Sequence, residues 1–387
     1  MNLTDIQESA TLKFSEAANE LKKQGKSIIS LGLGEPSFQT PSEIVNETIA
    51  ALKAGHTRYS STAGIPELRE LIAEKLRTEN TMQCTAQNIV ITPGAKQAIF
   101  LALRAILNPE DEIINITPCY VSNIPQIKIA QPSAKIINID LDKNTHKLDI
   151  TKIKQSITPK TKAILINSPH NPTGKVFTKE ELSNLAKLAK EHNIFIISDE
   201  IYEKLIFDSQ NPHYSIASFD GMAERTITIN GFSKTYSMTG WRLGYCCAPE
   251  KIAKIMTLIS QHINTNVCTF IQKGACAIKN IPDVYLKNFI TQIKTNAQLL
   301  NATIKETKNL SLVSPNGSFF GFINISKTNM ESDKFCSKLL IDKGVAITPG
   351  ISFGSNWDDH IRVSLSASTK DFEEGMKRLK EWSEELE

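Results

Sequence analysis

The feature of this sequence that most constrains its fold is a series of short apolar segments that alternate with helix-like ones. The apolar segments are rich in isoleucine and threonine, which favour buried β-strands. They cover residues 89–92, 112–117, 163–167, 194–198 and 226–229. Segments with helical character follow, for example at residues 95–107 and 179–192. This alternation predicts an α/β fold with a largely parallel sheet.

Each predicted strand is followed by a residue with a chemical use. In chain order these residues are Gly94, Tyr120, Asn171, Asp199 and Lys234. In open α/β sheets, ligands bind beyond the carboxyl ends of the strands. We therefore expect these five residues to converge on one edge of the sheet and to form a binding site there.

The stretch Thr226–Gly244, TITINGFSKTYSMTGWRLG, carries the most specific chemistry. Asn230-Gly231 is predicted to end the strand, which leaves Lys234 in the following loop. Burial beside another cation would lower the lysine pKa and make the amine a nucleophile. Arg242 offers a planar fork suited to a phosphate. A pyridoxal phosphate (PLP) imine needs both groups. The alternative is that both are solvated surface charges, as loop lysines usually are.

This stretch resembles the PLP-attachment segment of class I aminotransferases, the fold-type I family of aspartate and aromatic aminotransferases. Gly34-Glu35-Pro36, the Asn171–Gly174 motif N-P-T-G and the Asp199–Tyr202 motif D-E-I-Y also follow the family's order. The resemblance implies a large PLP-binding domain over residues 41–283, with a central, mostly parallel seven-stranded sheet. Residues 1–40 and 284–387 would form an N-terminal arm and a smaller α+β domain.

The resemblance also implies a role for each matching residue. Lys234 would hold PLP as an imine and move protons, Asp199 would keep the pyridine nitrogen protonated, and Tyr202 would donate to the phenolate oxygen. The other expected cofactor contacts are Tyr120 against the ring, Asn171 at the ring oxygen, and Ala95, Lys96, Ser233, Arg242 and a neighbouring subunit's Tyr59 around the phosphate. For Asp199 the alternative is a helix N-cap, and for Tyr59 it is an ordinary surface or interface aromatic.

Substrate contacts follow from the same resemblance. Arg362, in the strand-like segment I-R-V-S, would pair bidentately with the α-carboxylate that amino and 2-oxo acids share. Asn171 and the Gly34 backbone would assist. Lys96, helped by Thr11, would meet a distal carboxylate. Many aspartate-specific relatives carry tryptophan at the position of Tyr120, so the tyrosine leaves the substrate preference open.

The expected activity is transfer of an amino group from an L-amino acid, aspartate or glutamate first, to a 2-oxo acid such as 2-oxoglutarate. Aromatic amino acid aminotransferase activity is the alternative, followed by a PLP C–S lyase. The family relationship and Tyr59 imply a homodimer with shared active sites.

Composition limits the other possibilities. The net charge is only +3 and no basic run occurs, so no nucleic acid partner is expected. The N-terminus lacks a signal peptide's apolar core, and the apolar stretch 98–107 is too short to span a bilayer. Seven cysteines without a C-x-x-C pair favour reduced thiols and a cytoplasmic location. His170 has no accompanying ligand pattern, and no metal is expected.

Overall fold

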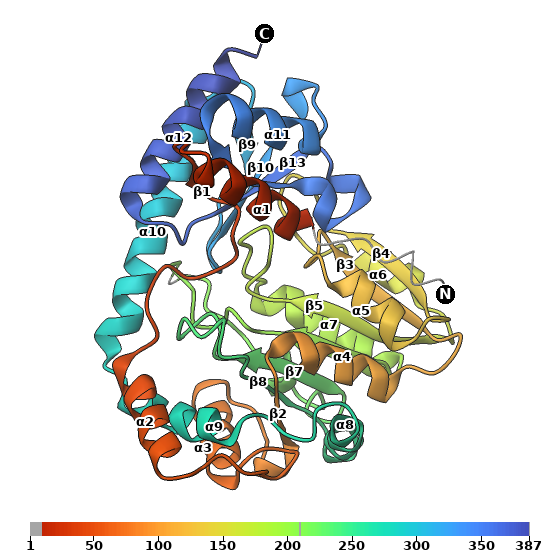
Figure 1. The fold of residues 1–387 in the computed structure, drawn as a ribbon. Helices are drawn as coiled ribbons and strands as arrows, with labels where there is room; N and C mark the ends of the chain where they lie inside the picture. Colours follow the sequence, from red (N-terminus) through yellow and green to blue (C-terminus); the bar gives the residue numbers. More distant parts are fainter. Residues whose placement is uncertain (1–9, 209, 387) are drawn as a thin grey trace.

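The computed structural model describes residues 10–208 and 210–386. A seven-stranded sheet forms its centre, with strand order β2-β8-β7-β6-β5-β3-β4 (Figure 1). Strand β8 pairs antiparallel with both of its neighbours, β2 and β7, and all the other strand pairs of this sheet are parallel. The predicted mostly parallel sheet of seven strands is confirmed. Its strands are β2 (Ile89–Thr92), β3 (Glu112–Thr117), β4 (Lys135–Asp140), β5 (Thr161–Asn167), β6 (Phe195–Asp199), β7 (Thr226–Gly231) and β8 (Gly244–Cys247).

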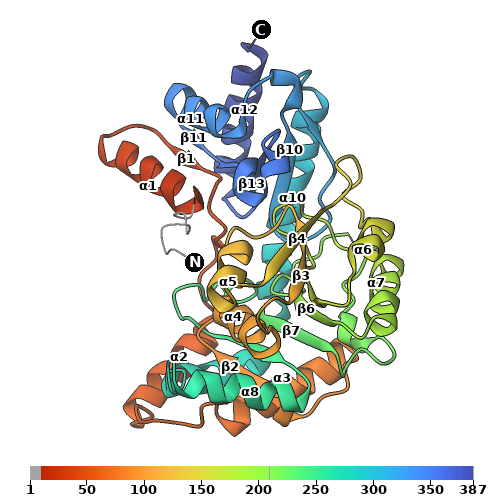
Figure 2. The ribbon, with the colours of Figure 1, turned by 90° about the vertical axis from the view of Figure 1, so that its right-hand side faces the viewer.

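Helices cover both faces of this sheet, which explains why most strands are apolar on both sides. Helices α4, α5 and α8 pack on one face and α6 and α7 on the other. Near β2, helices α2, α3 and α9 cover the end of the sheet (Figure 1), and Figure 2 shows α2 and α3 there from a second side. The bounds are α2 (Ser42–Lys53), α3 (Pro66–Glu79), α4 (Ala95–Ile106), α5 (Asn123–Ala130), α6 (Ile150–Ser156), α7 (Lys179–Glu191), α8 (Glu250–Gln261) and α9 (Thr269–Ala275).

The C-terminal part of the chain builds a second, four-stranded antiparallel sheet in the order β12-β13-β10-β9. The N-terminal segment joins this part, because β1 pairs in parallel with β11. The elements are α1 (Ala10–Lys23), β1 (Ile29–Ser30), α10 (Asp283–Lys305), β9 (Ser311–Leu312), β10 (Phe320–Asn324), α11 (Ser332–Lys343), β11 (Val345–Ala346), β12 (Thr348–Pro349), β13 (His360–Ser364) and α12 (Thr369–Glu384).

Short 3₁₀ helices lie between these elements, at η2 (Ala86–Asn88), η3 (Ile216–Ser218), η4 (Cys276–Asn280), η5 (Ser326–Thr328), η6 (Gly350–Phe353) and η7 (Ser355–Trp357). In the part of the chain that the structure describes, no helix combines the length and apolarity needed to cross a membrane.

One local prediction is wrong. Asn230-Gly231 does not end the strand, because both residues belong to β7 and pair with β8. Gly231 lies opposite Gly244, and a Cβ on Gly231 would come within 3.0 Å of the Gly244 Cα. Two facing glycines allow this close pairing, so tertiary contact overrides the turn propensity of the sequence.

Candidate active site

A cavity of about 510 Å³ opens at the carboxyl edge of the seven-stranded sheet. The loop before α2 and strands β10 and β13 close its other side. Most of the residues predicted to form a site line this one cavity. Its lining consists of Gly32, Leu33, Gly34, Glu35, Ala95, Lys96, Ile99, Tyr120, Asn167, Asn171, Asp199, Ile201, Tyr202, Ser233, Lys234, Thr239, Arg242, Phe320 and Arg362.

Lys234 enters the cavity from the loop after β7. Its Nζ donates a hydrogen bond of 2.7 Å to the Gly34 carbonyl oxygen. Burial lowers the pKa of the Lys234 amine to about 8, although the Glu35 carboxylate opposes the change. The positive charges of Arg362 and Arg242 lower this pKa further. About a tenth of the amine is therefore uncharged, and nucleophilic, at pH 7, far more than for a solvated lysine.

Asp199 is the last residue of β6, and its side chain is almost fully buried. The Ile201 backbone N–H donates to its Oδ1 at 3.2 Å. Burial raises the pKa of the Asp199 carboxyl to about 7, and the neighbouring Glu200 charge raises it further, while Lys234 acts in the opposite direction. Among the described residues, no cation forms an ion pair with this carboxyl. A buried acid of this kind is stabilised when a cation binds beside it.

Two aromatic side chains and an amide lie around Asp199 and Lys234. The Tyr202 ring packs edge-on against Phe319, with 5.3 Å between ring centroids, and burial raises the pKa of its hydroxyl. Tyr202 therefore remains a proton donor at all working pH values. The Asn171 backbone N–H donates to Asn167 Oδ1 at 2.7 Å, which fixes Asn171 at the cavity wall.

Arg362 projects from β13 and is buried. Its Nη1 donates to Asn171 Oδ1 at 3.0 Å and its Nη2 to the Gly32 carbonyl oxygen at 2.7 Å. The guanidinium carbon lies 4.2 Å from the ring centroid of Phe320. Its Nε has no hydrogen-bond partner, and no described carboxylate pairs with the group. A guanidinium held in this way can bind a substrate carboxylate by donating hydrogen bonds to it.

An anion cradle lies at the start of α4. Gly94 precedes the helix with φ 85° and ψ 162°, and no side chain caps the first turn. A Cβ on Gly94 would lie 2.5 Å from Arg242 Nη2. The Arg242 Nη1 donates to the Thr239 carbonyl oxygen at 2.6 Å, which holds the guanidinium near the helix N-terminus. Free amides, a helix dipole and a guanidinium together favour a phosphate.

Lys96, in the first turn of α4, provides a further positive charge in the cavity. Its Nζ lies 5.7 Å from the centre of the Tyr120 ring. The cavity therefore presents an ammonium in addition to the guanidinium of Arg362, and two separate carboxylates of one small molecule could be bound.

One predicted residue, Tyr59, does not line the cavity. The Tyr59 side chain is 87% exposed at the surface. Thr11 lies in α1, but its side chain falls outside the described part of the structure.

Sequence reasoning also missed cavity residues. Asn167 ends β5 as Asp199 ends β6, and its Nδ2 donates to the Asp199 carbonyl oxygen at 2.8 Å. Asn167 could have been predicted from its position at the carboxyl end of a strand, where ligands bind in such sheets. Glu35 lies in the Gly34-Glu35-Pro36 motif and Thr239 in the stretch Thr226–Gly244, whereas no sequence pattern predicted a site residue at Phe320.

Comparisons with known proteins agree with this geometry. The sequence profile of the aminotransferase class I and II family matches residues 26–379. An aspartate aminotransferase from Bacillus subtilis is 39% identical over 97% of this chain and 96% of its own length. An aromatic-amino-acid aminotransferase from Thermococcus litoralis is 37% identical over 91% of this chain and 90% of its own.

Solved structures agree as well. An aspartate aminotransferase from Thermus thermophilus, solved with maleate, superposes with a TM-score of 0.93 at 33% identity and covers 98% of both chains. The family match spans most of the chain, and the relatives align over nearly their full lengths. The chain therefore belongs to the class I and II aminotransferases, a family of PLP-dependent enzymes.

Proposed function

We propose that this enzyme transfers the amino group of aspartate or glutamate to a 2-oxo acid such as 2-oxoglutarate. The observation that carries the proposal is the pair of cations in the cavity. Arg362 lacks a carboxylate partner among the described residues, and the Lys96 ammonium lies over Tyr120. A dicarboxylic substrate matches both charges, and the related Thermus thermophilus structure contains maleate.

Three features of the cavity support PLP as the cofactor. Asp199 is a buried acid that a protonated ring nitrogen would stabilise. The free N-terminus of α4, with Arg242 and Ser233 beside it, suits the phosphate, and a Gly94 Cβ would intrude on this space. Lys234 supplies an amine with a lowered pKa. When bound, PLP supplies an electrophilic carbonyl carbon and a ring that withdraws electrons from the substrate.

The chain's own groups then divide the remaining tasks. Arg362, Asn171 and the Gly34 backbone bind the α-carboxylate, which orients the substrate Cα toward Lys234. The uncharged Lys234 amine takes the Cα proton and returns a proton on the product side. Tyr202, protonated at neutral pH, serves as the hydrogen-bond donor at the ring oxygen. Thr11 is proposed to assist Lys96 at the distal carboxylate.

Aromatic amino acids are the second candidate substrates. The Tyr120 ring and the side chains of Leu33, Ile99 and Phe320 give the cavity an apolar surface that could hold a ring. The Thermococcus litoralis relative, named an aromatic-amino-acid aminotransferase, also favours this candidate.

Steady-state kinetics of Lys96→Asn distinguishes the two. We expect kcat/KM for aspartate to fall about 100-fold, because the buried distal carboxylate would lose its cation, and kcat/KM for phenylalanine to change little. Lys128→Asn, an exposed lysine on α5, is the matched control. Equal losses for both substrates would contradict the assignment of Lys96.

We further propose a cytoplasmic homodimer in which Tyr59 reaches the partner's phosphate site. Its almost complete exposure supports such a contact, since large exposed aromatics mark interfaces. Mixing inactive Tyr59→Ala and Lys234→Ala proteins after subunit exchange tests it. In mixed dimers one site regains both residues, so activity should return. No recovery in a proven mixed dimer would contradict a shared site.

The domain boundaries also remain a proposal: 41–283 for the large domain, and 1–40 with 284–387 for the arm and small domain. The pairing of β1 with β11 and the confinement of the large sheet to residues 89–247 support this division.

A further inference from the structure

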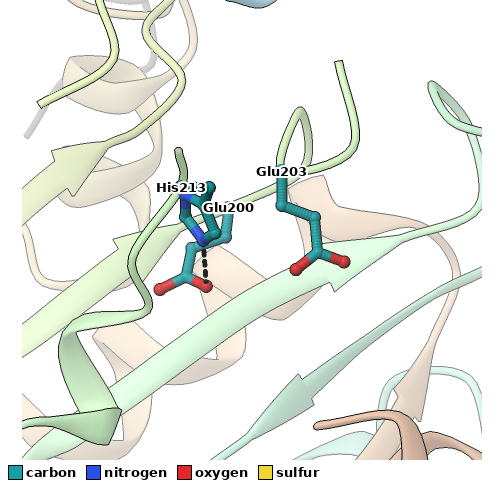
Figure 3. Close-up of side chains that lie close together, drawn as sticks. All are labelled: Glu200, Glu203 and His213. Carbon is teal, nitrogen blue, oxygen red and sulfur yellow. Dashed lines mark hydrogen bonds and ion pairs between the residues drawn. The ribbon is translucent and has the colours of Figure 1, made fainter. Parts of the chain in front are cut away.

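A buried polar network lies behind the active-site cavity, on the other side of β6. Successive side chains of a strand point to opposite faces. Asp199 faces the cavity, whereas Ser198 and Glu200 point away from it. Figure 3 shows that Glu200, Glu203 and His213 lie close together there. Their ligand atoms lie within 4.8 Å of one another.

The hydrogen bonds of this network have a defined direction that begins at Lys75. An ammonium can only donate, so the 2.8 Å contact from Lys75 Nζ fixes the Asn80 Oδ1 as an acceptor. The Asn80 Nδ2 then donates to Ser215 Oγ at 2.8 Å. Since Ser215 accepts that bond, its own hydrogen is free to donate to Glu200 Oε2, 2.5 Å away. The network therefore ends on the Glu200 carboxylate.

Two more donors converge on Glu200. Ser198 Oγ lies 2.9 Å from Oε1, and His213 Nε2 lies 3.0 Å from Oε2. The His213 Nδ1 is buried without a partner. Glu200 therefore accepts hydrogen bonds from Ser198 and Ser215 and is paired with His213, and among the described residues no lysine or arginine forms an ion pair with it.

Glu203 is also buried but has a different environment. Lys75 forms an ion pair with its Oε1, and Asn80 Nδ2 donates to its Oε2 at 2.7 Å. Burial opposes ionisation, but the Lys75 charge dominates and the pKa of Glu203 falls to about 2. Because protein donors already occupy both oxygens, a metal ion bound by these acids would first have to displace Lys75. The arrangement is a charge network rather than a metal site.

We propose that Glu200 is a positioning residue that acts through Asp199: its buried carboxylate, held directly behind that of Asp199, favours a protonated ring nitrogen in the cofactor held there. Asp199 and Glu200 are adjacent in sequence, and the Glu200 backbone N–H is bound to the Ile229 carbonyl oxygen at 2.8 Å. This bond fixes the second carboxylate behind the first. The inference rests on the proposed function, because it assumes that PLP binds at Asp199.

Other ionisable groups adjoin the two acids. Lys234 and Tyr202 face Asp199 from the cavity side. His213, Tyr245 and Cys247 surround Glu200 from the other elements. Tyr245 and Cys247 are neutral near pH 7 because their pKa values are raised. Among the described residues, Lys75 forms an ion pair with Glu203, whereas no lysine or arginine forms one with Glu200, whose partner is His213.

The test measures cofactor binding rather than activity. Apoenzyme is titrated with PLP and with its deaza analogue, in which C–H replaces the ring nitrogen. The wild-type protein should prefer PLP. Glu200→Gln should reduce the ratio of the two affinities by about tenfold, as loss of a neighbouring buried charge predicts. Asp220→Asn, which removes an exposed acid, should leave the ratio unchanged, and Glu200→Asp, which keeps the carboxylate, should preserve most of it.

The possible outcomes distinguish an electrostatic role of the Glu200 carboxylate from a purely structural one. If Glu200→Gln weakens both ligands equally, or leaves the ratio unchanged, the charge role is refuted. If this variant fails to fold, Glu200→Ala also removes the carboxylate and should lower the ratio in the same direction. An unchanged ratio in a folded Glu200→Ala protein would then overturn the proposal. A wild-type protein that binds neither ligand would instead refute the proposed function.

Discussion

Asp199→Asn should stabilise the cofactor-free enzyme even though it impairs the function proposed for this residue. The wild-type carboxyl is buried without a cation, and burial raises its pKa from 3.8 to about 7. Between these values the folded protein holds a proton that the unfolded chain has released. Wild-type stability therefore falls as pH rises through this window and is constant above it. Asparagine does not titrate, so its stability shows no such fall.

The size of the effect follows from the same pKa difference. A rise from 3.8 to about 7 corresponds to about 4 kcal/mol. About 2.5 kcal/mol of this should develop between pH 5 and pH 7, and this is the part that a denaturant series can measure. Equilibrium urea unfolding of both apoproteins at equal protein concentration gives the difference at each pH.

Asp220→Asn is the control, because Asp220 is exposed and already paired with Lys190 at 2.8 Å. The difference in unfolding free energy between the Asp220→Asn variant and wild type should not vary between pH 5 and pH 7. Saturating PLP should reverse the order of wild type and Asp199→Asn, since a bound cation would compensate the wild-type carboxylate. A pH-independent difference between these apoproteins would refute the reasoning.

Three other predictions follow from the site. Gly94→Ala should lower the free energy of unfolding in urea by about 1–3 kcal/mol, because the φ and ψ values of Gly94 (85° and 162°) suit glycine alone. Gly240→Ala is the control and should leave the stability unchanged, since open space surrounds Gly240. Equal stabilities of the two variants would contradict the strain argument. The rate of PLP attachment to apoenzyme, followed by absorbance, should rise with pH around a midpoint near 8, since only the uncharged Lys234 amine reacts; a midpoint near 10 would show a solvated lysine. Arg362→Lys should raise KM for all amino acids about tenfold or more, because one ammonium cannot replace the hydrogen bonds to Asn171 and Gly32 or the contact with Phe320; an unchanged KM would remove Arg362 from substrate binding.

Much of the site could be predicted because its chemistry is encoded locally. Asp199 and Lys234 follow apolar strands, and parallel strands bring such positions together without any long-range information. Phe320 could not be found in this way. Its position over Arg362 depends on the pairing of β10 with β13, which places Phe322 opposite Arg362.

Other limits have equally specific causes. Asn230-Gly231 has the composition of a turn, yet its pairing with β8 keeps it in a strand. The Glu200 network is assembled from α3, the loop around Ser215 and β6, so no single stretch of sequence reveals it. Tyr59 stays a prediction, because its expected partner belongs to another subunit.

The contact between Arg362 and Gly32 has a consequence for synthesis of the protein. The Nη2 of Arg362 donates to the Gly32 carbonyl oxygen across 330 positions of sequence. During translation the early arm segment must wait, without this partner, until almost the whole polypeptide has left the ribosome. A nascent chain that ends before β13 already contains every strand of the large sheet but lacks Arg362 and with it the carboxylate-binding wall of the cavity.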